Sequence, residues 1–553
     1  SIIFVYVLFI IYLFNRLKLS EISAIFISIF IFSMPLFKNY SIYFDQSIYS
    51  MFCFSVVIIE IFYKKTKPDY LILIISIFSL FRYSSIAAYP AAFIYCYIYY
   101  NSKTIGWRNK ATKFLQSLTP ILLSIPVIIF PVLIGTPTTD KLYNIDTNIA
   151  EILQFHGSLT EDKNALFDLP NCLKYTEVIN SGDLMSDGLL YGGDPDGMEF
   201  FDLPGKKLAL VINHETSHLD TSLNKTTAYR SVNRIPYSGG TSTVIINQEN
   251  LSVEKSFRSL TGTIKNCAGG KTPWNTWISC EETYQDNHGY AFEVNPQIKL
   301  HGYKRLSNMG RFKREAVAID INDNLGSVYQ TEDSPNGLLY KFVPLKKTDL
   351  AGSGKLYALK VRNLINADNS EAKINIGDSF NVSWVEIQDP EAVLKKTKHQ
   401  GIEKGATTFN GSEGIIVQKN NQEESEVFFT CKSGGFSGLG QIWKYNTSEE
   451  TLTLFYESSD KEKFWMGDNI TIAPWGDLIV CEDNDSNACK LLGFTPNGKM
   501  YTLGKVSSNN STEIAGVCFS PDGSKMALNL QHAGKTIVIT GDWEKIKNLS
   551  KTI

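Results

Sequence analysis

The chain has 553 residues, with 53 Lys and Arg, 56 Asp and Glu, and a formal net charge of -3. It is too long for one ordinary domain. The nearly balanced charge, with no basic run after the apolar N-terminal part, gives no indication of nucleic-acid binding. Nine cysteines are scattered without a CxxC or Cys/His spacing, which argues against a zinc finger.

Residues 1–135 are dominated by Ile, Phe, Tyr and Leu, and we expect a polytopic α-helical transmembrane region there. The region opens within an apolar stretch, so we expect it to be truncated. Basic residues follow the first, third and fifth apolar segments, which predicts cytoplasmic loops there and a periplasmic or extracellular chain after about Thr136. Several segments are shorter than the roughly 20 residues of a full span. The segments cover residues 2–14, 22–37, 48–63, 69–81, 84–100 and 114–135.

A linker with a short helix is predicted over 136–165, and residues 166–553 show mainly strand and turn signals. One pattern recurs in this second part: an acid opens a short apolar strand, a turn follows, and a second strand ends in another acid. Repeated strand units of this size predict an all-β domain, a β-propeller of about six blades. The copies lie at 315–333 and 468–483, in partial form at 413–431 and 513–523, and as one more acid-ended strand at 277–282.

The innermost strands of a propeller line one central channel, so acids at equivalent places on these strands converge. Carboxylates that are gathered in this way repel each other unless cations lie among them. The repeat therefore predicts a site for several metal ions in the channel.

Four motifs, in order, resemble the PhoX family of alkaline phosphatases. The longest runs from Asn266 to Glu282 and reads NCAGGKTPWNTWISCEE. The others are Asn213-His214-Glu215, the run GRFKREA over 310–316, and PDG over 521–523. The resemblance covers about residues 166–545. It implies a secreted phosphomonoesterase that hydrolyses phosphate esters with an iron–calcium cluster in a propeller channel.

The resemblance also implies the residues of the site. A thiolate suits iron and hard carboxylates suit calcium, and Cys267 is the matched iron ligand. Clustered cations would bind a phosphate ester and neutralise the charge that develops on its oxygens. Glu281 and Glu282 are either both ligands, or one ligand and one solvated neighbour. The implied catalytic residues are Cys267, Glu315 and Glu413, and the implied metal ligands are Cys267, Glu215, Glu281, Glu282, Glu315, Glu413 and Asp468.

Two positions depart from the family pattern. Gly411 stands where an Arg that grips phosphate is expected, and Arg314 stands where a His is common. The loss of a bidentate Arg would weaken the binding of a phosphate monoester by roughly 2–3 kcal/mol if nothing replaced it. Two alternatives therefore stay open at this point: a non-catalytic, calcium-stabilised propeller that binds a ligand or partner, and a calcium-dependent lactonase.

Overall fold

The computed structural model describes residues 159–225, 228–230, 235–299, 304–420, 422–484, 488–507 and 511–553. The chain divides into two compact units, 1–147 and 148–553, and all described residues belong to the second. The predicted transmembrane region and most of the predicted linker lie outside the described residues and stay predictions. Among the described residues, no helix is long and apolar enough to cross a membrane.

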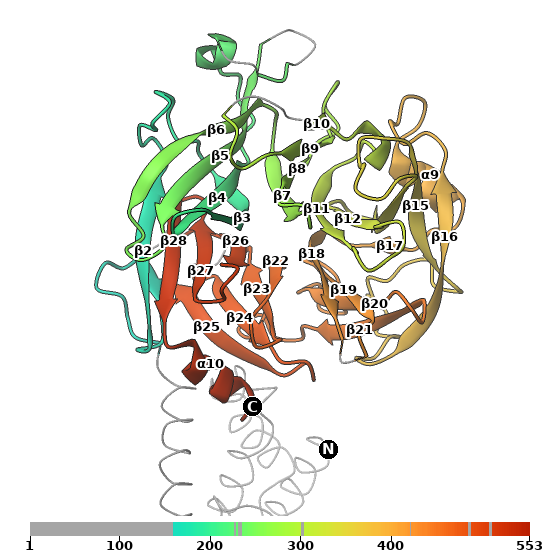
Figure 1. The fold of residues 1–553 in the computed structure, drawn as a ribbon. Helices are drawn as coiled ribbons and strands as arrows, with labels where there is room; N and C mark the ends of the chain where they lie inside the picture. The colour runs from blue at the N-terminus through green and yellow to red at the C-terminus, as the bar shows by residue number, and fades with distance from the viewer. Residues whose placement is uncertain are drawn as a thin grey trace, which may run out of the picture. The chain divides into compact units, whose positions relative to one another are not determined.

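Antiparallel strands of the described residues form six blades around one axis (Figure 1). The prediction of a β-propeller is therefore confirmed. Blade 1 consists of β3 (Pro195–Leu203), β4 (Lys207–His214), β5 (Tyr237–Asn247) and β6 (Val253–Gly262). Blade 2 consists of β7 (Asn266–Lys271), β8 (Trp277–Glu281), β9 (Ala291–Val294) and β10 (Lys304–Arg305). Blade 3 consists of β11 (Arg314–Ile319), β12 (Val328–Glu332), β14 (Tyr340–Pro344) and β15 (Gly354–Val361).

The second half of the ring repeats this plan. Blade 4 consists of β18 (Ser412–Lys419), β19 (Ser425–Cys431), β20 (Gln441–Asn446) and β21 (Thr451–Glu457). Blade 5 consists of β22 (Gly467–Ile472), β23 (Leu478–Glu482), β24 (Lys490–Phe494), β25 (Met500–Val506) and β1 (Phe167–Asp168). Blade 6 consists of β26 (Ile514–Phe519), β27 (Lys525–Leu530), β28 (Lys535–Gly541) and β2 (Leu173–Asn180).

A few elements lie outside this plan. The strand β16 (Ser379–Ile387) pairs with both β15 and β21, so it joins blades 3 and 4 into one sheet. The short strands β13 (Gly337–Leu338) and β17 (Thr408–Phe409) pair with each other. The helical segments within the described part of the chain are η2 (Thr221–Lys225), η3 (Ser307–Met309), α9 (Thr397–Glu403) and α10 (Trp543–Ser550).

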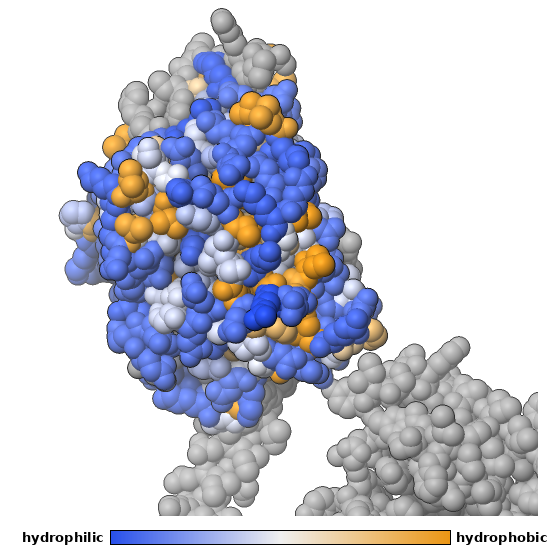
Figure 2. All heavy atoms as spheres, turned by 90° about the vertical axis from the view of Figure 1, so that its right-hand side faces the viewer, coloured by the Kyte–Doolittle hydropathy of each residue, from blue (hydrophilic) through white to orange (hydrophobic). Residues whose placement is uncertain are grey.

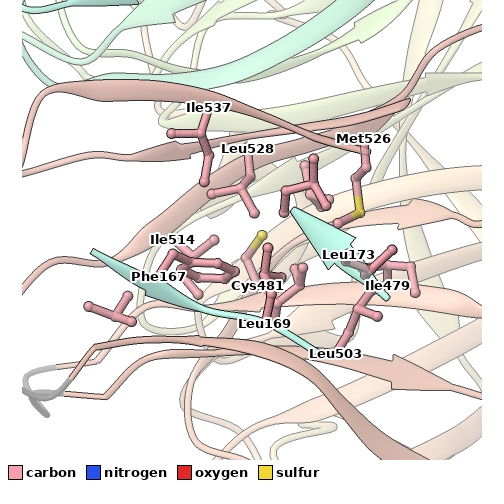
Figure 3. Packing of buried hydrophobic residues seen from close by; sticks show 14 of the residues in the cluster. Phe167, Leu169, Leu173, Ile479, Cys481, Leu503, Ile514, Met526, Leu528 and Ile537 are labelled. Carbon is pink, nitrogen blue, oxygen red and sulfur yellow. The ribbon is translucent and has the colours of Figure 1, made fainter. Parts of the chain in front are cut away.

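The ring is closed by strands from both ends of the propeller. The N-terminal strands β1 and β2 add to β25 and β28 of the last two blades. Apolar side chains of this N-terminal segment, among them Phe167 and Leu173, pack against Cys481, Ile514 and Ile537 of blades 5 and 6 (Figure 3). This burial of apolar surface stabilises the closure without a covalent bond.

The first strands of the six blades line the axis. They contact one another in the order β3, β7, β11, β18, β22, β26 and back to β3. The axis holds a cavity of about 170 Å³, lined by residues such as Met198, Gly270, Ala318 and Thr471 of four of these strands. On the face of the molecule seen in Figure 2, hydrophilic side chains predominate on the outer surface, and hydrophobic side chains form small separate patches.

Candidate metal centre and active site

Each of the six inner strands carries a β-bulge at the same place, directly after its first residue or two. The register shifts there by one residue against the second strand of the blade. A bulge re-aims the side chain of the extra residue and is common next to active sites. We call the first bulged residues the first ring. They are Asp196, Cys267, Glu315, Glu413, Asp468 and Gly516.

The second bulged residue is small in four blades because the neighbouring inner strand passes very close. A Cβ at Gly197 would lie 2.5 Å from the Cα of Ala268, and one at Gly414 would lie 2.7 Å from the backbone nitrogen of Ile470. These small residues let the inner strands approach, which brings the first-ring side chains of adjacent blades together. In blade 6 the first bulged residue itself is Gly516, and a Cβ there would lie 2.2 Å from the carbonyl oxygen of Asp196.

Polar side chains of the second strands hold several of the bulges in place. The amide of Asn213 donates to the carbonyl oxygens of Cys267 and Ala268 of the next blade, at 2.9 Å and 2.7 Å. The hydroxyl of Thr430 donates in the same way to the carbonyl of Asp468, at 2.6 Å. The hydroxyl of Thr331 donates to the carbonyl of Glu413, and the amide of Asn529 donates to the carbonyl of Asp196. The Asn of the Asn213-His214-Glu215 motif therefore positions Cys267.

Within the described residues, the first ring supplies most of two groups of possible metal ligands. One group joins Asp196, Glu215 and Cys267, and the other joins Glu315, Glu413 and Asp468. Within each group the ligand atoms lie within 4.8 Å of one another. In the first group the Cys267 thiol donates to Asp196 at 3.2 Å. In the second group the three carboxylates come from blades 3, 4 and 5.

The electrostatics of the two groups favour the binding of cations. Burial, and next the neighbouring carboxylates, raise the pKa of Asp196, Glu315 and Glu413 well above the ordinary range. The same causes raise the pKa of the Cys267 thiol. Among the described residues, one oxygen of Asp196 and one of Glu315 lack a hydrogen-bond partner, whereas the corresponding oxygen of Glu413 lies 2.7 Å from the Lys432 ammonium. Buried polar atoms of this kind are costly unless a ligand satisfies them. Hard oxygen donors with one thiol fit calcium and iron ions.

A second ring surrounds the first. It consists of the residue that follows the second strand of each blade. The backbone N–H of each of these residues donates to a carbonyl at the start of the inner strand; in blade 2, for example, Glu282 donates to Lys265 at 2.9 Å. The hydrogen bond fixes the second ring next to the first. Its members are Glu215, Glu282, Asp333, Lys432, Asp483 and Gln531.

The family is settled by comparison with known proteins. The sequence model described as alkaline phosphatase PhoX matches residues 154–534. The chain belongs to the PhoX alkaline phosphatase family, whose members are phosphoric ester hydrolases. A comparison with curated proteins found no match.

The fold is shared with a solved structure. Pseudomonas fluorescens PhoX in complex with vanadate, a transition state analogue, has 17% identity and a TM-score of 0.54, over 70% of this chain and 97% of that chain. A putative gluconolactonase has 10% identity and a TM-score of 0.32, over 68% and 95% of the two chains. A pyranose dehydrogenase domain from Coprinopsis cinerea has 9% identity and a TM-score of 0.36, over 68% and 97%.

Two implied metal ligands of this PhoX family member lie outside the two groups: Glu282, which belongs to the second ring, and Glu281. Glu281 is fully buried, and its oxygens accept hydrogen bonds from the backbone of Ile264, Gly289 and Tyr290 and from the His288 ring. It is therefore neither a solvated neighbour nor a member of the ligand groups, and its role is to hold the loops of its own blade.

The acid pairs divide in the same way in three blades. Glu332 accepts hydrogen bonds from two tyrosine hydroxyls, and Glu482 accepts from the backbone of Trp465 and Lys490. The second acid of each pair, Glu282, Asp333 or Asp483, belongs to the second ring instead. A pair of adjacent acids thus supplies one structural carboxylate and one that faces the site.

The two departures from the family pattern have different explanations. Arg314 is fully buried and points away from the site, because its guanidinium donates to Gln330 and to the carbonyl of Gly310 and stacks over Phe312. Gly411 has a φ of +62°, a conformation that favours glycine. It lies at the edge of the second ring, where its carbonyl accepts the N–H of Lys432 at 2.7 Å.

Several residues of the site were not predicted from the sequence. Asp196 belongs to the first ring, and its signal is the acid–glycine pair Asp196-Gly197 before an apolar strand, the same pair as Glu413-Gly414. Three lysines also escaped prediction. They alternate with second-ring acids: Lys265 contacts Glu215 and Glu282, Lys313 contacts Glu282 and Asp333, and Lys432 contacts Asp333 and Asp483.

Proposed function

We propose that this chain hydrolyses phosphate esters outside the cytoplasm and holds a mixed iron–calcium cluster at the two ligand groups. The observation that carries the proposal is the convergence of five bulged residues, four acids and one thiol, on one end of the channel. Membership of the PhoX family supports it, and so does the vanadate complex of the Pseudomonas fluorescens relative, which has the same fold.

The donor types suggest how the metals divide. Asp196, Glu215 and Cys267 combine two carboxylates with a sulfur, which is a set that suits iron. Glu315, Glu413 and Asp468 offer oxygen only, which suits calcium. When bound, such cations supply Lewis acidity for a phosphoryl group and activate an oxygen nucleophile.

The residues of the chain prepare the site for this chemistry. Gln531 donates to both Asp196 and Glu215, at 3.1 Å and 2.9 Å, and so orients two acids of the sulfur-containing group. Burial of the first ring excludes water from the far side of the acids. Lys265 and Lys313 are more exposed than the acids with which they pair, and Lys432 is more exposed than Glu413 and Asp333. The lysines therefore leave positive charge between these acids and the solvent from which a phosphate ester arrives.

The test is activity together with metal content. The purified full chain should hydrolyse an aryl phosphate and contain both iron and calcium by elemental analysis. Cys267→Ala should remove iron and activity together. Protein that holds calcium without iron and shows no turnover, after expression with iron available, would refute the proposal in favour of the non-catalytic calcium-stabilised propeller. Hydrolysis of a lactone by the same protein, without phosphatase activity, would refute it in favour of the lactonase.

A further inference from the structure

Blade 4 breaks the pattern of the second ring. Four blades place an acid there and blade 6 places Gln531, but blade 4 places Lys432. The Lys432 ammonium lies 2.7 Å from Glu413 Oε1, although not in hydrogen-bond geometry, and 3.5 Å and 3.7 Å from Asp333 and Asp483. Its side chain is 23% exposed, whereas that of Glu413 is 2% exposed. The ammonium therefore lies between the buried acids and the solvent.

Gly411 makes room for this lysine. A Cβ at position 411 would lie 3.0 Å from Cγ of Lys432 and 3.0 Å from the hydroxyl oxygen of Ser433. This is tighter than ordinary van der Waals contact, so the stem of Lys432 crosses the space that a side chain at 411 would need. A side chain at 411 would therefore need Lys432 or Ser433 to shift.

Blades 2 and 3 show the opposite arrangement. The residue whose carbonyl accepts the second-ring N–H is Lys265 in blade 2 and Lys313 in blade 3, and the second-ring residue is an acid in both. In blade 4 the accepting residue is Gly411 and the second-ring residue is Lys432. Each of the three blades thus supplies one cation to the same end of the channel, but blade 4 supplies it from the second strand.

We propose that Lys432 is a substrate-binding residue that grips the phosphoryl group in place of the missing arginine at 411, and this inference rests on the proposed function. A lysine offers three donors and no acceptor. When cations neutralise Glu413, Asp333 and Asp483, the Lys432 ammonium is free to turn toward an anion that enters from the solvent. Because it is a point charge on a flexible stem, it binds phosphate without the two-pronged geometry of arginine.

The arrangement also predicts which substrates depend most on Lys432. Lys265, Lys313 and Lys432 alternate with acids along three adjacent blades, so several positive charges border the mouth of the site. A phosphate monoester carries more negative charge than a diester. Loss of the Lys432 charge should therefore weaken the binding of a monoester more than the binding of a diester.

The experiment compares Lys432→Met, Lys432→Gln and Lys432→Arg with a matched control, Lys444→Met. Lys444 lies on β20 of the same blade, is 30% exposed and pairs with Glu426 at 3.0 Å, away from the site. Three quantities are measured on the metal-loaded full chain: the Kd of inorganic phosphate by calorimetry, KM and kcat for aryl phosphate monoesters and diesters, and iron and calcium content.

Loss of one charge-assisted hydrogen bond should raise the phosphate Kd and the monoester KM by about 10- to 100-fold in Lys432→Met and Lys432→Gln. The diester KM should change less, Lys432→Arg should stay within a few-fold of the parent, and Lys444→Met should match it. An unchanged phosphate Kd in folded Lys432→Met would overturn the inference. A gain of one equivalent of metal in Lys432→Met would also overturn the inference, because Lys432 would then occupy the place of a metal ion.

The failure of the proposed function would look different. A metal-loaded parent that neither binds phosphate nor hydrolyses a phosphate ester would refute the proposed function itself. A parent that does both, with Lys432→Met indistinguishable from it, would refute only the role of Lys432.

Discussion

Removal of the metals should make the stability of the propeller depend on pH in an unusual direction, and Asp468 allows the effect to be measured. Burial, and next the charge of Asp483, raise the pKa of Asp468 from an ordinary 3.8 to about 7. A carboxyl group whose pKa is raised in the folded state contributes stability at low pH, because the folded protein binds more protons. It loses this contribution as the pH rises through 7.

The magnitude follows from the two pKa values. At pH 5 the folded state keeps Asp468 protonated while the unfolded chain does not, which stabilises the fold by roughly 2.7 kcal/mol. At pH 8 both states are ionised and the contribution is close to zero. Metal-free protein should therefore lose about 2.5 kcal/mol of unfolding free energy between pH 5 and pH 8 from this one group.

Asp468→Asn is the matching perturbation. The amide stays neutral at every pH and keeps an oxygen that can accept from Asn469, as Asp468 does at 2.9 Å. Urea unfolding of chelated parent and variant, followed by fluorescence at pH 5 and pH 8, gives the two free energies. The variant should lose about 2.5 kcal/mol less than the parent over this range. Equal losses in both proteins would refute the reasoning, since Asp468 would then ionise in the fold without cost.

Three further outcomes are expected. Cys518→Ala should keep metals and activity and lose only about 1–2 kcal/mol of stability, because this thiol is buried in an apolar cluster. A loss of iron in this variant would contradict the assignment of Cys518 as a packing residue. Gly411→Arg should lower stability and leave phosphate affinity unimproved, because the backbone at 411 has a φ of +62° and the stem of Lys432 fills the space; a tighter phosphate Kd in a stable variant would contradict this. A reporter that is active only outside the cytoplasm should be active when fused after Thr139, and a signal from a cytoplasmic reporter at that junction would overturn the predicted topology.

The sequence allowed the propeller to be predicted because its repeat is local. An acid, a short apolar strand, a turn and a second acid lie close together in the chain, so both ends of the pattern are visible without knowledge of the fold. The same pattern pointed to Glu315, Glu413 and Asp468, which the structure brings into one group. Their role as metal ligands stays a prediction.

Other features depend on which face of a strand a residue occupies. Successive side chains of a strand point to opposite faces, so Glu281 and Glu282 cannot both face the site, but the sequence does not say which one does. In the structure Glu281 pairs with Asn266 within the sheet, and Glu282 is the acid that faces the site. Asp196 was missed for a different reason. The repeat requires a second strand that ends in an acid, but in this blade the second strand ends in His214, and the acid, Glu215, comes one residue later.

The charge balance of the two rings argues for more than one metal ion. The first ring holds four acids, Asp196, Glu315, Glu413 and Asp468, and the second ring holds four more, Glu215, Glu282, Asp333 and Asp483. Three lysines, Lys265, Lys313 and Lys432, lie among them. When all of these acids are ionised, five negative charges remain unbalanced before the Cys267 thiolate is counted. One divalent or trivalent cation is too few for this excess, and buried like charges at these distances do not stay ionised without partners. Either several cations bind together, or some of the acids keep their protons, so the arrangement of acids favours the uptake of more than one cation.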